Sequence, residues 1–144
     1  SGKSYAGVHK IFAAASTKQC IGVRRSNMEN GAEVIIAPSG NIADQQFAFE
    51  KVGDKYRIKA MHSGKYLTVD GDWKNGTYIT QSDAVDDRLQ LFEVIDAGNG
   101  SVKLKTDKGF FATPMVGSIK TASRIVIWQE KGNYNQQFRL TNAQ

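Results

Sequence analysis

The sequence predicts an all-β domain built from three similar units, and three observations support this. The pattern Gln-x-Phe occurs three times, and its glutamines, Gln45, Gln90 and Gln136, are 45 and 46 residues apart. Short apolar segments alternate with turn dipeptides at the spacing typical of β-barrels and β-sandwiches. No long, well-capped stretch places apolar residues at helical spacing, so we expect little helix. Three units of about 46 residues, each with about four strands, favour a closed threefold arrangement.

The expected strands follow one another in the same order in each unit. The first strand of each unit is centred on an apolar residue: Ile11, Ile58 or Leu104. The second strand carries an apolar pair: Ile21 with Val23, Leu67 with Val69, or Phe111 with Thr113. The third strand is centred on Val34, Ile79 or Ile125, and the Gln-x-Phe tripeptide leads into the fourth. The repeat therefore keeps its register across several elements.

Asn-Gly dipeptides separate several of these strands, at Asn30-Gly31, Asn75-Gly76 and Asn99-Gly100. Both residues tolerate positive φ, which the tight turns of β-hairpins require. We therefore expect a hairpin turn at each of these positions.

The length of 144 residues fits a single domain, since cores of roughly 100–150 residues form one unit. We place the domain at residues 1–144 and its repeats at about 5–52, 53–99 and 100–141. No apolar run approaches the ~18 residues that a membrane-spanning helix needs, so no membrane span is expected. The first residues contain no apolar signal-peptide core.

The net charge of +5 raises the question of a polyanionic partner. Lys55, Arg57 and Lys59 alternate with apolar residues, however, which is typical of the wet face of a half-buried strand. We therefore do not expect nucleic acid as a partner. The single cysteine, Cys20, excludes an internal disulfide, and the two histidines offer little for a metal site, so we expect neither metal nor cofactor.

The three tripeptides resemble the Gln-x-Trp repeat of the ricin B-chain type lectin domain. The segments Tyr56-Arg57-Ile58, Ser63-Gly64-Lys65-Tyr66-Leu67 and Asn133-Tyr134-Asn135-Gln136-Gln137-Phe138 extend the resemblance, which covers about residues 5–140. It implies a β-trefoil, with twelve strands forming a six-stranded barrel capped by three hairpins. It also implies that Phe47, Phe92 and Phe138 pack in the core, where family members usually carry Trp.

The resemblance further implies one sugar site in each repeat, built from an Asp on the second strand, a stacking aromatic and an Asn before the tripeptide. The Asp position corresponds to Gly22, Thr68 and Ala112, so all three repeats lack the carboxylate. The aromatic position corresponds to Ala37, Ser82 and Trp128, and the Asn position to Asp44, Leu89 and Asn135. Only the third repeat keeps the aromatic and the amide. Its candidate ligand-binding residues are Trp128, Asn135 and Gln136.

Strand alternation supports this choice, because it places Trp128 on the face opposite the apolar Ile125 and Ile127. The alternative is a structural tryptophan. In the second repeat, Asp70 and Trp73 together form a second candidate pair, in which a displaced carboxylate and an aromatic rebuild a sugar site. The alternative there is a polar hairpin tip whose tryptophan covers a neighbour. Lys74 stands where a calcium loop needs an oxygen ligand, so calcium is not expected.

These observations predict a non-catalytic carbohydrate-binding protein, either a lectin or a carbohydrate-binding module, with glycans or glycoconjugates as ligands. No segment resembles a nucleophile elbow or a phosphate-binding loop, so no enzymatic activity is expected. One alternative is an interaction scaffold that has lost sugar binding and docks a protein partner or a parent polypeptide. Another is a weak binder of heparin-like polyanions. A secreted location is favoured, and a cytoplasmic one stays open.

Overall fold

The computed structural model describes residues 3–115 and 120–142, and these form twelve β-strands. Six strands close a barrel, in which each pairs antiparallel with two neighbours. In order around the barrel they are β1 (Gly7–Ala13), β4 (Phe47–Val52), β5 (Lys55–Ala60), β8 (Phe92–Gly98), β9 (Ser101–Thr106) and β12 (Phe138–Asn142). Closure leaves this sheet without an exposed edge.

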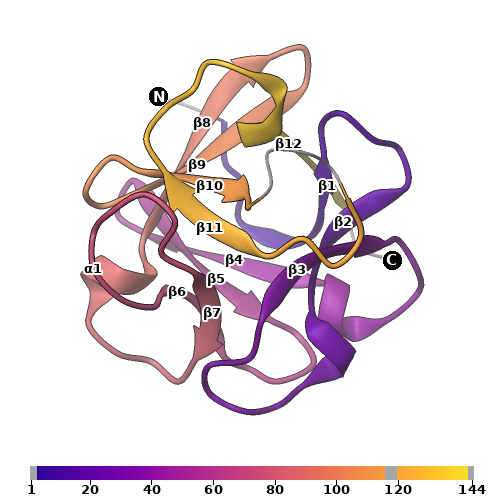
Figure 1. Cartoon of the computed structure of the whole chain (residues 1–144), viewed down its shortest axis with the longest axis vertical. Helices are drawn as coiled ribbons and strands as arrows, with labels where there is room; N and C mark the ends of the chain where they lie inside the picture. The colour runs from indigo at the N-terminus through magenta and orange to yellow at the C-terminus, as the bar shows by residue number, and fades with distance from the viewer. Residues whose placement is uncertain (1–2, 116–119, 143–144) are drawn as a thin grey trace.

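The other six strands form three hairpins, one in each repeat (Figure 1). They are β2 (Gln19–Val23) with β3 (Val34–Pro38), β6 (Tyr66–Val69) with β7 (Ile79–Ser82), and β10 (Phe111–Pro114) with β11 (Ile125–Trp128). Single bridges join the hairpins in a triangle: Glu33 to Thr80, Tyr78 to Val126, and Arg124 to Ile35. A six-stranded barrel with three linked hairpins is a β-trefoil, which confirms the predicted fold class.

Short helical turns precede the last strand of each repeat. They are η2 (Ala43–Gln45), α1 (Asp87–Gln90) and η3 (Tyr134–Gln136), and a further turn, η1 (Arg24–Ser26), follows β2. Asp86 caps α1 by accepting a hydrogen bond from the backbone N–H of Arg88. The low helix content agrees with the sequence prediction.

The aromatic residues of the three tripeptides lie in the core, as predicted. Phe47, Phe92 and Phe138 are 0%, 1% and 0% exposed. Each opens a barrel strand immediately after a short helical turn, so the repeat delivers one large ring to the interior three times.

The alternating charges of β5 lie on the outer face of the barrel. Lys55, Arg57 and Lys59 are half-buried, whereas Tyr56, Ile58 and Ala60 between them are buried. Their carboxylate partners are, in order, Asp107, Asp87 and Glu50. This confirms that these charges belong to a solvated strand face.

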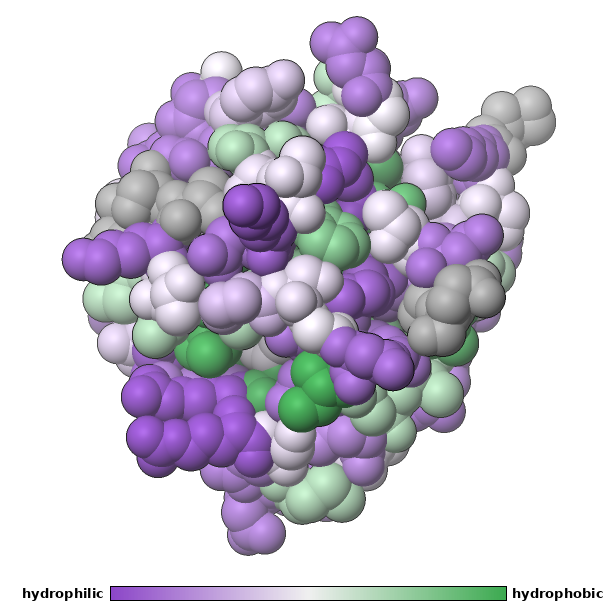
Figure 2. Space-filling view, turned by 90° about the vertical axis from the view of Figure 1, so that its right-hand side faces the viewer, coloured by the Kyte–Doolittle hydropathy of each residue, from purple (hydrophilic) through white to green (hydrophobic). Residues whose placement is uncertain are grey.

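The surface turned to the viewer in Figure 2 is mostly hydrophilic, with apolar side chains in small separate patches. Within the described part of the chain, no helix is long and apolar enough to cross a membrane. Cys20 is buried and unbridged, and burial raises the pKa of its thiol, which favours the protonated form.

Candidate functional site

Three buried glutamines shape the loop beside each candidate site. The amide oxygen of Gln136 accepts a hydrogen bond from Lys131 N at 2.8 Å, and its amide nitrogen donates to Gln129 O at 2.9 Å. Gln45 makes the same two bonds with Gly40 and Pro38, and Gln90 makes them with Val85 and Asp83. Gln136 is 0% exposed. Both polar atoms of its amide are therefore hydrogen-bonded within the protein. We assign to Gln136 the role of positioning the loop rather than of contacting a ligand.

Thr68, which stands at the position that the resemblance assigns to the sugar-binding carboxylate, and Thr113 of the third repeat make the same pair of hydrogen bonds. Thr68 Oγ1 accepts a hydrogen bond from Gln90 Nε2 at 3.0 Å and donates to Tyr66 O at 2.8 Å. Thr113 Oγ1 likewise accepts from Gln136 Nε2 at 3.1 Å and donates to Phe111 O at 2.8 Å. Both threonines are buried, so each hydroxyl joins its strand to the tripeptide glutamine and is not directed at solvent.

The strand registers correct one assignment made from the sequence. Gly22 pairs with Ile35 and Thr68 pairs with Thr80, and the equivalent pair in the third repeat is Thr113 with Val126. Thr113, not Ala112, therefore stands at the carboxylate position. The inward-facing counterpart of Ile21 and Leu67 is Ala112, which lies in the hydrophobic core. The carboxylate is absent from all three repeats with either assignment.

Two of the Asn-Gly turns connect their repeat to the next one. Asn30 Oδ1 accepts from Asp83 N at 2.9 Å, and Gly31 N donates to Gln81 O at 2.8 Å. One repeat later, Asn75 Oδ1 accepts from Gln129 N at 2.8 Å, and Gly76 N donates to Ile127 O at 2.9 Å. Each turn thus forms a wall beside the strand end of the following repeat.

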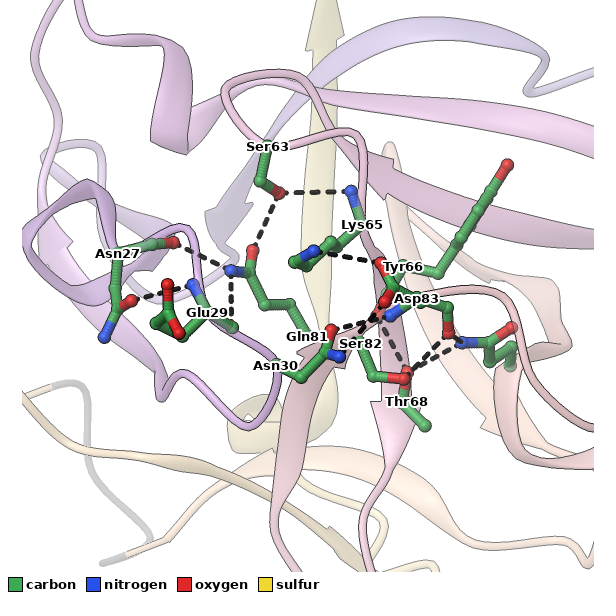
Figure 3. Close-up of polar contacts among 11 residues, drawn as sticks. Asn27, Glu29, Asn30, Ser63, Lys65, Tyr66, Thr68, Gln81, Ser82 and Asp83 are labelled. Carbon is green, nitrogen blue, oxygen red and sulfur yellow. Dashed lines mark hydrogen bonds and ion pairs between the residues drawn. The ribbon is translucent and has the colours of Figure 1, made fainter.

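Figure 3 shows how the first of these walls is held. The buried Gln81 amide nitrogen donates to Asn27 O at 2.7 Å and to Glu29 O at 2.9 Å, so it ties this loop to β7. Asp83 accepts hydrogen bonds from both Lys65 and Asn30, and these contacts hold the pKa of its carboxyl below the ordinary value. This contact between repeats was not predicted from the sequence, although Asn30 and Asn75 are 45 residues apart, as the repeat requires.

This wall closes one side of a cleft of about 430 Å³, which we call the second-repeat cleft. Asn30 and Gly31 line it from the first repeat. The lining residues from the second repeat include Thr68, Asp70, Thr80, Ser82, Val85 and Leu89. All three positions carried over from the family to this repeat, Thr68, Ser82 and Leu89, therefore meet in one cavity.

Asp70 supplies the carboxylate of the second-repeat cleft. It is exposed, and its Oδ2 accepts a hydrogen bond from Thr80 Oγ1 at 3.1 Å. Trp73, its predicted partner, packs against the hydrophobic core and is not among the residues that line the cleft. The structure thus brings Asp70 to the candidate site and places Trp73 beside it as a packing residue.

The second candidate site, the third-repeat surface, consists of Trp128, Lys131, Tyr134 and Asn135. Trp128 is half-buried at the end of β11. A Cβ atom at Gly76 would lie 3.7 Å from Trp128 Cζ3, so the Asn75-Gly76 turn packs against the indole. The Lys131 ammonium lies 4.9 Å from the centroid of the Trp128 ring.

The two remaining members of the third-repeat surface come from η3. Tyr134 is 57% exposed, and Asn135 is half-buried. The side chain of Asn133 fixes this turn by accepting a hydrogen bond from Asn135 N at 3.0 Å. Trp128 and Asn135 thus flank the loop that Gln136 holds.

The first repeat has a different arrangement at the equivalent positions. Asp44 is buried and accepts a hydrogen bond from Ser26 Oγ at 2.7 Å. A side chain at Gly22 would meet Gln45 Cγ at 3.2 Å and Asp44 Oδ1 at 3.4 Å, so this position has little room. No group of three or more His, Cys, Asp or Glu residues within 3–115 and 120–142 is arranged to hold a metal ion.

Residues 43–110 match the family model described as ricin-type beta-trefoil lectin domain-like. The search of curated proteins gave no significant match. A designed threefold symmetric protein, ThreeFoil, is 26% identical, with a TM-score of 0.90 and 94% of this chain and 99% of that chain covered.

Two natural proteins share the fold at lower identity. The Macrolepiota procera ricin B-like lectin, solved with lactose, is 15% identical, with a TM-score of 0.83 and 99% of each chain covered. An exo-β-1,3-galactanase from Clostridium thermocellum is 22% identical, with a TM-score of 0.88. The match covers 96% of this chain but only 30% of the galactanase.

Proposed function

We propose that this chain, a β-trefoil whose residues 43–110 match the ricin-type lectin model, is a non-catalytic carbohydrate-binding protein. The observation that carries the proposal is the second-repeat cleft, which is lined by the three positions that the resemblance assigns to a sugar site in this repeat and by Asp70. A cavity with apolar walls and a few placed polar groups is the usual form of a small-ligand site.

The second-repeat cleft offers a sugar two kinds of contact. Asp70 accepts hydrogen bonds from ring hydroxyls, and such charge-assisted bonds are stronger than neutral ones. Val85 and Leu89 supply an apolar wall for the C–H face of the pyranose ring. Thr80 orients the carboxylate through its bond to Oδ2, so that the other oxygen is available to the ligand.

The third-repeat surface is the second part of the proposal. Trp128 stacks on the ring of a bound saccharide, and Asn135 hydrogen-bonds its hydroxyls. The Macrolepiota lectin solved with lactose and the galactanase that carries a similar domain support a saccharide ligand for this chain as well. By the same likeness, a parent polypeptide that this domain directs to a glycan is a second kind of partner.

Glycan-array binding by matched variants tests the proposal. We expect Asp70→Asn, which keeps the bond from Thr80, to weaken the array signals of the second-repeat cleft about tenfold, the size of one charge-assisted hydrogen bond. Trp128→Ala should remove the signals of the third-repeat surface, and the double variant should keep only the weakened signals of the second-repeat cleft. Asp54→Asn, a substitution of an exposed turn carboxylate, is the control and should bind as the parent does.

A wild-type array without signals would contradict the proposal. A blank array together with a stoichiometric protein partner would favour the interaction scaffold. Binding to heparin that falls steeply with salt, without binding to neutral glycans, would favour the polyanion binder.

A further inference from the structure

Lys131 determines which kind of sugar, neutral or anionic, can stack on the Trp128 ring. Its ammonium lies 4.9 Å from the ring centroid, where the negative face of the indole attracts a cation. The backbone N–H of Lys131 is held by the buried Gln136 at 2.8 Å, so the residue is anchored beside the indole. A neutral sugar that stacks on this face must displace the ammonium, whereas a sugar with an anionic substituent gains it as a partner.

The charges around the indole favour an anion. Within residues 3–115 and 120–142, no carboxylate lies within ion-pair distance of Lys131. The adjacent Glu130 is paired with Lys103 at 2.6 Å, and Lys103 and Lys105 hold the pKa of its carboxyl below the ordinary value. The turn that packs on the indole carries Asp72 and Lys74, whose charges offset each other.

The carboxylate position of this repeat adds no negative charge. It is occupied by Thr113, whose hydroxyl is buried between Gln136 and Phe111. The second-repeat cleft is the opposite case, because Asp70 lines it. The two candidate sites therefore present opposite charges to a ligand.

We propose that the third-repeat surface selects acidic saccharides, those with a carboxylate or sulfate group, through Lys131 beside Trp128, while the second-repeat cleft selects neutral ones. This inference rests on the proposed carbohydrate-binding function and names the ligand class of one of its two sites. The anionic substituent pairs with the Lys131 ammonium, and the sugar ring contacts the indole.

The sequence provides a direct reporter, because Trp73 and Trp128 are the two tryptophans of the chain. In a Trp73→Phe background, the tryptophan fluorescence comes from Trp128 alone. We would titrate this variant with methyl galacturonide, with the methyl ester of the same uronide, and with methyl galactoside. The acid should bind about fivefold more tightly than its ester, the size of one partly exposed ion pair. A sulfated galactoside in place of the acid distinguishes the two anionic groups.

Substitutions of Lys131 supply the specific test. Lys131→Gln keeps the backbone bond to Gln136 and should abolish the preference for acid over ester, whereas Lys131→Arg should keep it. Lys51→Gln is the matched control, because the Lys51 ammonium also lies over an aromatic ring, 5.3 Å from the Tyr56 centroid, on a different element. This control should leave the preference unchanged.

Equal affinity for acid and ester, or a preference that survives Lys131→Gln, would overturn the inference and leave the proposed function standing. No response of Trp128 to any of these sugars would also overturn it. In that case, glycan-array binding by the Asp70→Asn variant still tests the proposed carbohydrate-binding function on its own.

Discussion

At the scale of single residues, buried side chains that hydrogen-bond within the protein determine the form of both candidate sites. Gln90 and Gln136 close the loops beside the sites, and Thr68 and Thr113 fill the position that the family reserves for a carboxylate. A threonine there is satisfied by the protein itself, which leaves ligand recognition to the residues around it. The residue that we propose for this role is Asp70 in the second repeat, and in the third it is Lys131 with Trp128.

Gln136→Ala should lower the free energy of unfolding by about 2–3 kcal/mol, because it leaves buried polar partners unsatisfied. Gln137→Ala is the control, since the side chain of Gln137, the next residue in the chain, is only half-buried. Denaturant midpoints measured for both variants test this expectation. Equal shifts for the two variants would contradict the positioning role of Gln136.

At the scale of elements, the Asn-Gly turns have a second role beyond reversing the chain. The positive φ of Gly76, +94°, lets the turn approach Trp128 closely, and the Asn75 side chain joins it to β11. The orientation of the indole thus depends on a turn from the preceding repeat.

Asn75→Ala should destabilise the protein by about 1 kcal/mol, the usual contribution of one hydrogen bond, and shift the emission of Trp128. Lys74→Ala, a change to an exposed neighbour in the same turn, is the control. Chemical denaturation and emission spectra in the Trp73→Phe background provide the measurement. An unchanged spectrum would show that the turn does not set the environment of the indole.

The sequence predicts the strands and the core well, because the tripeptides and apolar centres recur at fixed spacing. The position assigned from the sequence to the carboxylate in β10 was wrong by one residue. Phe111–Pro114 are all buried, so this segment shows no alternation of apolar and polar residues from which the register could be predicted. The second-repeat cleft could not be predicted, since Asn30 and Asp70 approach each other only after two repeats pack together. Asp70 and Trp73 are close in sequence, but packing against the core draws the indole away.

At the scale of the whole molecule, the three repeats are coupled at two levels. The barrel closes through pairs such as β1 with β12, and the hairpins meet through bridges at Glu33, Tyr78 and Arg124. The Arg124 guanidinium lies 3.5 Å from the Tyr78 ring centroid and adds a cation–π contact to this junction. The buried apolar residues of the three repeats also pack into one hydrophobic core.

This coupling predicts a single cooperative unfolding transition. Trp73 reports on the second repeat and Trp128 on the third, so Trp128→Phe and Trp73→Phe variants observe them separately. The unfolding of each variant, followed by its remaining tryptophan, should coincide with its own circular dichroism transition. Transitions that separate by probe would show that the repeats unfold independently.

The wall that the Asn30-Gly31 turn builds for the following repeat has a consequence for exchanging repeats between related proteins. The second-repeat cleft is encoded in two places, with Asn30-Gly31 in one repeat and Asp70 in the next. A chimaera with junctions at the repeat boundaries would inherit half of one cleft and half of another. To transfer the complete cleft, a chimaera would need the segment from the Asn-Gly turn of one repeat to the Gln-x-Phe tripeptide of the next. This segment does not coincide with a single structural repeat.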